Sequence, residues 1–341
     1  MNTRRHIVIT DQSHGLPYSK GVMASSLMGS GLSPTEAFGV AERIEEELLA
    51  KGTESVSSGE LRALAVSMLA EMGDQYSSTY LKWQAVEELD VPLIILLGGA
   101  TGVGKSTMAT QLAVRLGITR VISTDAIREV LRAVFSKDLM PTLHASSYEA
   151  DHSLRVPLPP NTDALLIGFQ EQVSAVAVGM KALIARALEE GTDIIVEGAH
   201  VVPGFLDGWE QEFKEAVIVP VVVTVGDERL HQSHFHRRAA ESRYRPGDRY
   251  LAAFSKIRKI QDYIRSLAED RNVPVVEMFD LDSTLQEIVT IVVEKALTGA
   301  QLRAESAIVG DGSRPAEDKP PGKTGARATA WQALTGRRSE P

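Results

Sequence analysis

Cysteine is absent from this chain of 341 residues. Without cysteine there is no disulfide framework, no thiolate nucleophile and no cysteine-based zinc site. The absence also fits a reducing compartment, so we expect a cytoplasmic protein.

An excess of basic residues is missing as well, because 36 lysines and arginines stand against 45 aspartates and glutamates, for a formal net charge of −9. Proteins that bind nucleic acids or anionic membranes through charge alone usually carry a basic surface. We therefore expect neither a nucleic acid nor a membrane as a partner. The expected partner is a small-molecule substrate, and the sequence leaves the oligomeric state open, a homo-oligomer included.

Long apolar runs are also missing. The longest, residues 91–97 and 217–225, are far shorter than the roughly 20 residues that cross a membrane. Residues 1–10 contain two arginines with no apolar segment behind them, which argues against a signal peptide. Hydrophobic residues make up 43% of the chain and charged residues 24%, the proportions of an ordinary soluble globular protein.

One motif carries most of the information: the pattern G-x-x-x-x-G-K-S from Gly99 to Ser106. The apolar run 93–97 before it predicts a buried parallel strand, and residues 107–116 after it have the pattern of an amphipathic helix. A strand, a glycine-rich loop and a helix in this order form a phosphate site, since the backbone N–H groups turn inward and the helix N-terminus is partly positive. We therefore expect ATP or GTP to bind here, rather than a glycine-rich turn with a chance lysine.

Within this loop, Lys105 is expected to act in catalysis by reaching the β- and γ-phosphates, and Ser106 to hold Mg²⁺. The nucleotide-binding set comprises Gly99, Ala100, Thr101, Gly102, Val103, Gly104, Lys105, Ser106 and Thr107.

Strand and helix patterns alternate over residues 91–298. The predicted strands are 91–97, 121–123, 193–196, 217–225 and 274–278, and the later helices are 126–136, 164–190, 228–241, 250–272 and 282–297. This alternation predicts an α/β fold, a P-loop NTPase/kinase-type parallel sheet with helices on both faces. Residues 1–90 read as a small, mainly helical domain, with capping boxes at Ser33 and Ser57. Residues 299–341, rich in Gly, Ala, Pro, Ser and charge, are expected to be a disordered tail.

Asp125 and Arg128 follow the predicted strand 121–123 and, spaced i and i+3, share one helix face. Asp125 could orient an acceptor hydroxyl and take its proton, and Arg128 could pair with a phosphate or carboxylate of the acceptor. An N-cap aspartate with a solvated arginine is an equally good interpretation of the spacing alone.

Glu197 ends a predicted strand in a pattern that resembles the second strand motif of phosphate-loop enzymes. An acid there can hold a Mg²⁺-bound water or polarise the attacking group, so Glu197 is predicted to be catalytic and to bind Mg²⁺ through water. A buried acid that caps a loop is the alternative. His200, three residues on, could line the acceptor pocket, but a lone histidine more often makes structural hydrogen bonds, and we expect that role.

A dense basic segment follows the strand predicted at 217–225. In phosphate-loop enzymes with small substrates, a mobile lid in this position brings arginines to the transferring phosphoryl group. Arg237 and Arg238 are our catalytic candidates, with a solvated basic helix as the alternative and metal binding by the histidines weakly supported. The cationic and imidazole side chains of the segment are Arg229, His231, His234, His236, Arg237, Arg238, Arg243 and Arg245.

Together, residues 98–106, 122–130, 136–148, 167–173 and 196–204 resemble the 2-phosphoglycerate kinase family, most specifically over 141–147. The resemblance covers roughly residues 91–298, and residues 1–90 are similar to an ATP-cone, a small helical regulatory nucleotide-binding module. The resemblance implies ATP and Mg²⁺ as cofactors, with transfer of the γ-phosphoryl group to the 3-hydroxyl of 2-phosphoglycerate to give 2,3-bisphosphoglycerate. It also implies that His144, Ser146 and Ser147 bind the substrate anion beside Asp125 and Arg128.

Two other functions stay open from the sequence. One is a kinase for a different phosphorylated or acidic metabolite, a nucleotide sugar included, because the pocket residues rather than the phosphate loop select the acceptor. The other is a regulator that senses nucleotide without catalysis. The presence of Lys105, Ser106, Asp125 and Glu197 argues against that second alternative.

Overall fold

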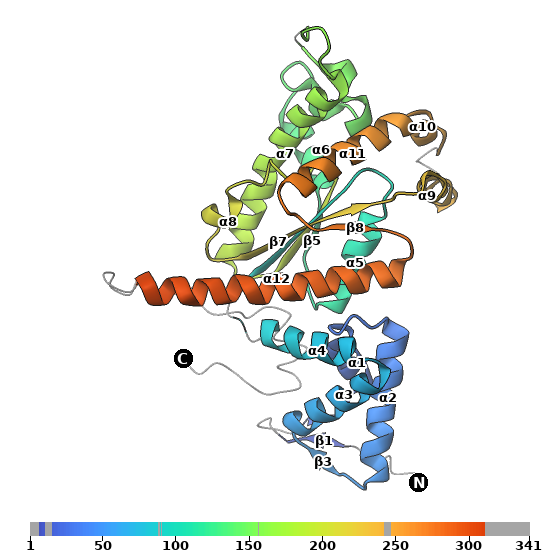
Figure 1. Cartoon of the computed structure of the whole chain (residues 1–341), viewed down its shortest axis with the longest axis vertical. Helices are drawn as coiled ribbons and strands as arrows, with labels where there is room; N and C mark the ends of the chain where they lie inside the picture. Colours follow the sequence, from blue (N-terminus) through green and yellow to red (C-terminus); the bar gives the residue numbers. More distant parts are fainter. Residues whose placement is uncertain are drawn as a thin grey trace.

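The computed structural model describes residues 7–10, 16–87, 89, 91–155, 157–241 and 247–310. Its larger part is a five-stranded parallel sheet flanked by helices, and its smaller part is a helical module with a short three-stranded sheet (Figure 1). The predicted α/β fold is therefore confirmed.

The large sheet has the strand order β5-β6-β4-β7-β8. All four pairings are parallel, so the carboxyl ends of the strands lie along one edge. The strands are β4 (Leu93–Gly98), β5 (Val121–Ser123), β6 (Ile194–Gly198), β7 (Val217–Thr224) and β8 (Val275–Glu277).

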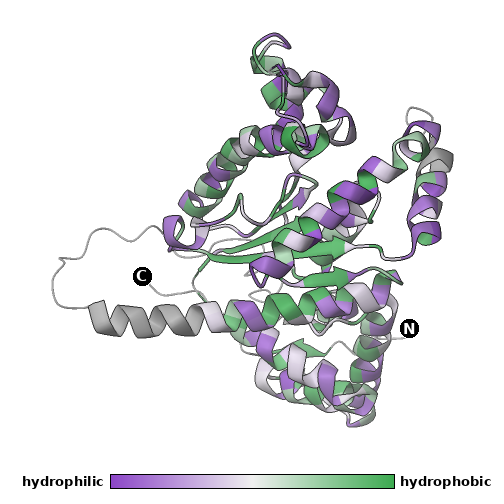
Figure 2. Cartoon of the chain, turned by 45° about the horizontal axis from the view of Figure 1, so that its top comes forward, coloured by the Kyte–Doolittle hydropathy of each residue, from purple (hydrophilic) through white to green (hydrophobic). Residues whose placement is uncertain are grey.

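Strand β4 lies in the middle of this sheet and is buried along its whole length. Because side chains alternate along a strand, Leu93, Ile95 and Leu97 pack into one hydrophobic core and Ile94 and Leu96 into another on the opposite face. Burial on both faces explains the unbroken apolar run in the sequence. Figure 2 shows the strands of the large sheet coloured mainly as hydrophobic.

Helices cover both faces of the sheet (Figure 1). The helices of the larger part are α5 (Lys105–Arg115), α6 (Thr124–Val134), α7 (Ala164–Glu189), α8 (Trp209–Glu212), α9 (Glu228–Glu241), α10 (Gly247–Ala252), α11 (Phe254–Asp270) and α12 (Leu281–Gly310), with the 3₁₀ segments η1 (Pro141–His144) and η2 (Ser147–Ser153) between α6 and α7.

Most predicted elements differ from the observed ones by one or two residues at their ends, and two helices differ by more. The helix predicted at 250–272 is divided into α10 and α11, because Ala253 leaves the helical conformation, with φ −97° and ψ 11°. The division lets Tyr250 and Phe254 both contact the ring of Phe235. Helix α12 continues to Gly310, so the predicted start of the tail at residue 299 falls inside a helix. The rest of the predicted tail, residues 311–341, lies outside the described residues.

The N-terminal module, residues 7–87, has its own hydrophobic core. Both predicted capping boxes are present, at Ser33 with Glu36 and at Ser57 with Glu60. The module contains α1 (Lys20–Met28), α2 (Pro34–Ala50), α3 (Ser58–Met72), α4 (Asp74–Glu87), β1 (Val8–Ile9), β2 (Leu16–Pro17) and β3 (Ser55–Val56).

A buried arginine links the module to the phosphate-loop helix. The side chain of Arg115, at the end of α5, is 1% exposed. Its Nη1 donates to the Gly31 carbonyl at 3.1 Å, and its Nη2 pairs with Asp282 at 2.8 Å. Trp83 of α4 belongs to the hydrophobic core of the large sheet, so the two parts are packed together. Among the described helices, none is both long enough and apolar enough to cross a membrane.

Candidate functional site

A cavity of about 420 Å³ lies at the carboxyl ends of the central strands. The register aligns Gly98 with Gly198 and Ser123 with Glu197, so the residues that follow β4, β5 and β6 are neighbours. Ligands of open parallel sheets bind at this edge. The cavity is lined by Thr101, Gly102, Gly104, Lys105, Ser106, Thr107, Ser123, Asp125, Arg128, Ser146, Ser147, Tyr148, Glu197, Gly198, Ala199, His234, Arg237, Arg249 and Tyr250.

The phosphate loop forms one wall of the cavity. Gly102 and Gly104 have φ near +90°, a conformation that side chains disfavour. A Cβ on Gly102 would also lie 2.4 Å from the ring of Phe235, so this position requires glycine. Of the predicted loop residues, Gly99, Ala100 and Val103 do not line the cavity, and the side chains of Ala100 and Val103 are fully buried.

Helix α9 holds this loop from outside. His231 Nε2 lies 2.9 Å from the Thr101 carbonyl oxygen and His234 Nδ1 lies 2.8 Å from that of Gly102. Because a carbonyl only accepts, both imidazoles donate. Burial lowers the pKa of His231 to about 4, so this side chain is neutral at physiological pH. His231 and His234 therefore fix the loop backbone.

A corner rich in oxygen ligands lies at the start of α5. Ser106 Oγ donates to Glu197 Oε1 at 2.9 Å, and Glu197 is only 6% exposed. Mg²⁺ prefers oxygen ligands, keeps several waters and usually takes one or two carboxylates together with phosphate oxygens. A serine hydroxyl and a carboxylate beside an open cavity fit that preference. Among the described residues no group of three or more His, Asp or Glu side chains could hold a metal without such added ligands.

Asp125 and Arg128 line the opposite wall. The N-cap of α6 is Ser123, whose hydroxyl accepts from the Ala126 N–H, so Asp125 does not cap the helix and its side chain is 71% exposed. Arg128 is 14% exposed, and its Nη1 donates to the carbonyls of Leu143 and Ala145 at 3.2 and 2.6 Å. Arg128 is therefore not a solvated arginine, because it holds the loop that carries Ser146 and Ser147.

The structure separates His144 from its predicted neighbours. Its Nε2 lies 2.9 Å from the Phe135 carbonyl, and His144 does not line the cavity. Ser146 and Ser147 do line it. Arg237 also reaches the cavity wall, whereas the side chain of Arg238 lies outside the described residues, as do Arg243 and Arg245.

Arg249 is a cavity residue that sequence reasoning missed. Its Nη2 donates to Ser146 Oγ at 3.1 Å and pairs with Glu149 at 2.5 Å, and this pair holds the pKa of Glu149 below its usual range. The neighbouring Tyr250 stacks on Phe235 at 5.1 Å and meets Tyr148 edge-on at 5.9 Å. The only sequence signal was the continuation of the basic segment past Arg245.

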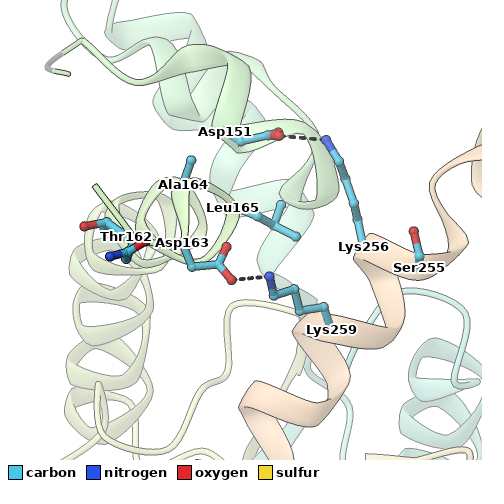
Figure 3. Close-up of a pocket in the computed structure, with 9 residues that line it drawn as sticks. Asp151, Thr162, Asp163, Ala164, Leu165, Ser255, Lys256 and Lys259 are labelled. Carbon is cyan, nitrogen blue, oxygen red and sulfur yellow. Dashed lines mark hydrogen bonds and ion pairs between the residues drawn. The ribbon is translucent and has the colours of Figure 1, made fainter. Parts of the chain in front are cut away.

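A second and larger cavity, of about 630 Å³, lies between α11 and the start of α7 (Figure 3). Its two cations are already neutralised, since Lys256 pairs with Asp151 at 2.7 Å and Lys259 pairs with Asp163. The phosphate loop contributes no residue to it. We therefore place no ligand there, and regard both ion pairs as links between α11 and the segment that precedes α7.

Comparison with known proteins agrees with this geometry. The family model described as an AAA domain matches residues 94–267, just over half of the chain. A 2-phosphoglycerate kinase of Methanothermobacter thermautotrophicus is 38% identical over 298 residues, which cover 87% of this chain and 97% of that protein. The 2-phosphoglycerate kinase of Thermococcus kodakarensis is 39% identical, covering 85% and 98%, and that of Pyrococcus horikoshii is 40% identical, covering 83% and 91%.

Proposed function

Because the chain belongs to the 2-phosphoglycerate kinase family, we propose that it transfers the γ-phosphoryl group of ATP to the 3-hydroxyl of 2-phosphoglycerate, giving 2,3-bisphosphoglycerate. The observation that carries the proposal is a single cavity that joins a phosphate loop to a cluster of cations. The proposed acceptor carries a hydroxyl, a phosphate and a carboxylate, which this cluster complements in charge.

We divide the cavity into two halves. The nucleotide half consists of loop residues 99–107 together with Glu197. The acceptor half consists of Asp125, Arg128, Ser146, Ser147 and Arg249. Both halves line the same cavity, so we place a γ-phosphate on the loop and an acceptor hydroxyl near Asp125 within it.

In the nucleotide half, the loop N–H groups and the N-terminus of α5 bind the β- and γ-phosphates. The Lys105 ammonium, only 7% exposed, neutralises the charge on the γ-phosphoryl group. Ser106 and Glu197 would hold Mg²⁺, Glu197 through a water, and the ion when bound would supply further charge neutralisation. Arg237 reaches the same cavity from α9 and adds positive charge.

In the acceptor half, Asp125 accepts a hydrogen bond from the acceptor hydroxyl and takes its proton as the new P–O bond forms. The bond between the γ-phosphorus and the β–γ bridging oxygen breaks, and ADP leaves with that electron pair. Arg128 and Arg249 pair with the acceptor's phosphate and carboxylate, and Ser146 and Ser147 donate to their oxygens. Positioning and charge neutralisation supply most of the catalysis in such transfers.

The test measures ADP release from ATP with Mg²⁺ and 2-phosphoglycerate, 3-phosphoglycerate, glycerate or no acceptor. We expect turnover only with 2-phosphoglycerate, and a bisphosphorylated product by ³¹P NMR. Turnover with a different acidic metabolite would show that the protein is a kinase but that its acceptor is not 2-phosphoglycerate. Tight ATP binding without any acceptor-dependent turnover would instead support a nucleotide sensor.

We also propose that residues 1–90 form a regulatory module of the ATP-cone type and residues 91–298 the kinase domain, followed by the tail predicted at 299–341, whose first residues continue α12 to Gly310. The buried contact of Arg115 with the Gly31 carbonyl supports a connection between the module and the phosphate-loop helix. Equilibrium dialysis with ATP should give two sites per chain if the module binds nucleotide, and one if it does not.

A further inference from the structure

A chain of fully buried polar side chains runs beneath the acceptor half. Its members are Thr124 at the start of α6, His200 after β6, and Gln172 on α7, and each is 0% exposed. Thr124 Oγ1 lies 2.9 Å from His200 Nδ1, and His200 Nε2 lies 2.9 Å from Gln172 Oε1. We call this the Thr–His–Gln chain.

The direction of every hydrogen bond in this chain can be assigned. Gln172 Nε2 donates to the carbonyls of Thr142 and Ala145, at 2.7 and 3.0 Å. Because carbonyls only accept, the amide nitrogen must face them and the amide oxygen must face His200. That oxygen also only accepts, so His200 carries its proton on Nε2, and its Nδ1 accepts from the Thr124 hydroxyl.

The neutral imidazole satisfies both of these bonds. Burial lowers the pKa of His200 to about 4, and the nearby charges of Arg128 and Lys105 act in the same direction while Asp125 opposes them. One tautomer of one charge state is therefore fixed at physiological pH, which gives the chain a single arrangement.

The far end of the chain reaches the residues proposed to bind the acceptor. The Ala145 carbonyl accepts from Gln172 and also from Arg128 Nη1 at 2.6 Å, so two donors hold it from different elements. Ser146 and Ser147 follow directly and line the cavity. At the near end, Thr124 precedes Asp125 in the first turn of α6.

Space around the near end is equally restricted. Gly198 has φ +150°, and a Cβ there would lie 1.8 Å from Thr124 Oγ1. The residue directly after Glu197 must therefore be glycine for the threonine hydroxyl to reach His200.

We propose that His200, through Thr124 and Gln172, is a positioning residue that sets the distance between Asp125 and the Ser146–Ser147 loop and so determines acceptor binding. None of the three chain members lines the cavity, so they act on the acceptor through other residues. The inference rests on the proposed function, and it predicts a selective effect: the KM for the acceptor changes, while that for ATP does not.

Three variants test the chain. Thr124→Val removes one hydroxyl at constant shape, whereas Thr124→Ser keeps it. Gln172→Met removes the amide at similar size. For Thr124→Val and Gln172→Met we expect the acceptor KM to rise about tenfold, since a buried partner is left unsatisfied. The KM for ATP should stay within about twofold, and Thr124→Ser should restore most of the acceptor affinity.

Two controls keep the result interpretable. Ser174→Ala removes an exposed hydroxyl on α7 that donates to the Gln170 carbonyl of its own helix, and should change neither KM. Because the chain acts as a unit, the double variant Thr124→Val/Gln172→Met should raise the acceptor KM little more than one substitution alone. Melting temperatures are recorded for every variant to separate misfolding from mispositioning.

Failure of this inference differs from failure of the proposed function. If the wild-type protein does not turn over 2-phosphoglycerate, the proposed function is wrong. The Thr–His–Gln chain would then be tested by ¹⁵N NMR, which should show a neutral His200 with its proton on Nε2. If the wild-type protein is active, two results in the variants would overturn the positioning role. One is an equal rise in the KM for the acceptor and the KM for ATP, and the other is an unchanged KM for the acceptor. A His200 with its proton on Nδ1, or a cationic His200 at pH 7, would also overturn the positioning role.

Discussion

The nucleotide half of the cavity comes mainly from one stretch of chain, residues 99–107, whereas the acceptor half is assembled from three separate segments. The loop needs only its glycines, a strand before it and a helix after it. The acceptor half depends on contacts between residues far apart in sequence, such as Arg249 with Ser146 and Gln172 with Ala145. A site built from consecutive residues can be recognised as a sequence motif, whereas a site assembled from distant segments cannot.

The same contrast extends to energetics. In the proposed mechanism, the nucleotide half acts directly on the transferring group, so its loss should reduce the rate. Apart from Asp125, the acceptor half is proposed to bind and orient a small anion, so the loss of its other side chains should mainly weaken acceptor binding. The predictions below test this division.

The largest effect is expected from Lys105→Ala. It removes the buried charge proposed to neutralise the transferring phosphoryl group, and kcat should fall by at least about a thousandfold. Steady-state assays measure the loss, with the exposed Lys214→Ala as the control for general loss of a cation. Near-normal turnover would place the chemistry outside the nucleotide half.

The second prediction concerns stability beneath the acceptor half. The pKa of His200 falls from an ordinary 6.5 to about 4 on folding, so the unfolded chain takes up the proton first. Neutral His200 therefore contributes to the free energy of unfolding in full above pH 6.5. This contribution, about 3 kcal/mol in total, is lost as the pH falls toward 4.

Urea unfolding between pH 7 and pH 4.5 measures this dependence in wild type and in His200→Gln, which cannot titrate. The free energy of unfolding should fall less steeply in the variant. His231, whose pKa burial also lowers to about 4, is common to both proteins, so the difference isolates His200. Identical slopes would mean that His200 is not buried in its neutral form.

The third prediction concerns Arg249, which lies in the acceptor half although no motif marked it. Arg249→Ala should raise the acceptor KM about tenfold and leave the KM for ATP nearly unchanged. The acceptor KM of Arg249→Lys should lie between those of the wild type and Arg249→Ala, because a lysine keeps the charge but not the paired donors. Arg265→Ala, which breaks an exposed pair with Glu269 on α11, is the matched control. A change in the KM for ATP alone would move Arg249 to the nucleotide half.

The smallest effect is expected outside both halves. Lys259 is 53% exposed and pairs with Asp163 in the larger cavity (Figure 3). Surface pairs of this kind contribute less than about 1 kcal/mol, so Lys259→Ala should lower the stability slightly and change neither KM. Should the acceptor KM rise severalfold, the larger cavity would be part of the site after all.

Much of the fold followed from the sequence because its signals are local. The apolar run of β4, the capping boxes at Ser33 and Ser57, and the alternation of strand and helix each depend on neighbours a few residues away. The phosphate loop is local in the same sense, and the structure places Lys105, Ser106 and Glu197 in one cavity as those patterns predicted. Their roles in catalysis stay predictions.

Tertiary structure alone decided which other side chains reach that cavity. His144 turned toward the Phe135 carbonyl, Arg249 entered from α10, and Arg128 became a support for the Ala145 carbonyl. His200 was expected only to make structural hydrogen bonds, and it makes them, but its partners Thr124 and Gln172 could not be named in advance. Each of these outcomes depends on which elements pack together, and buried polar groups take whichever partners that packing supplies.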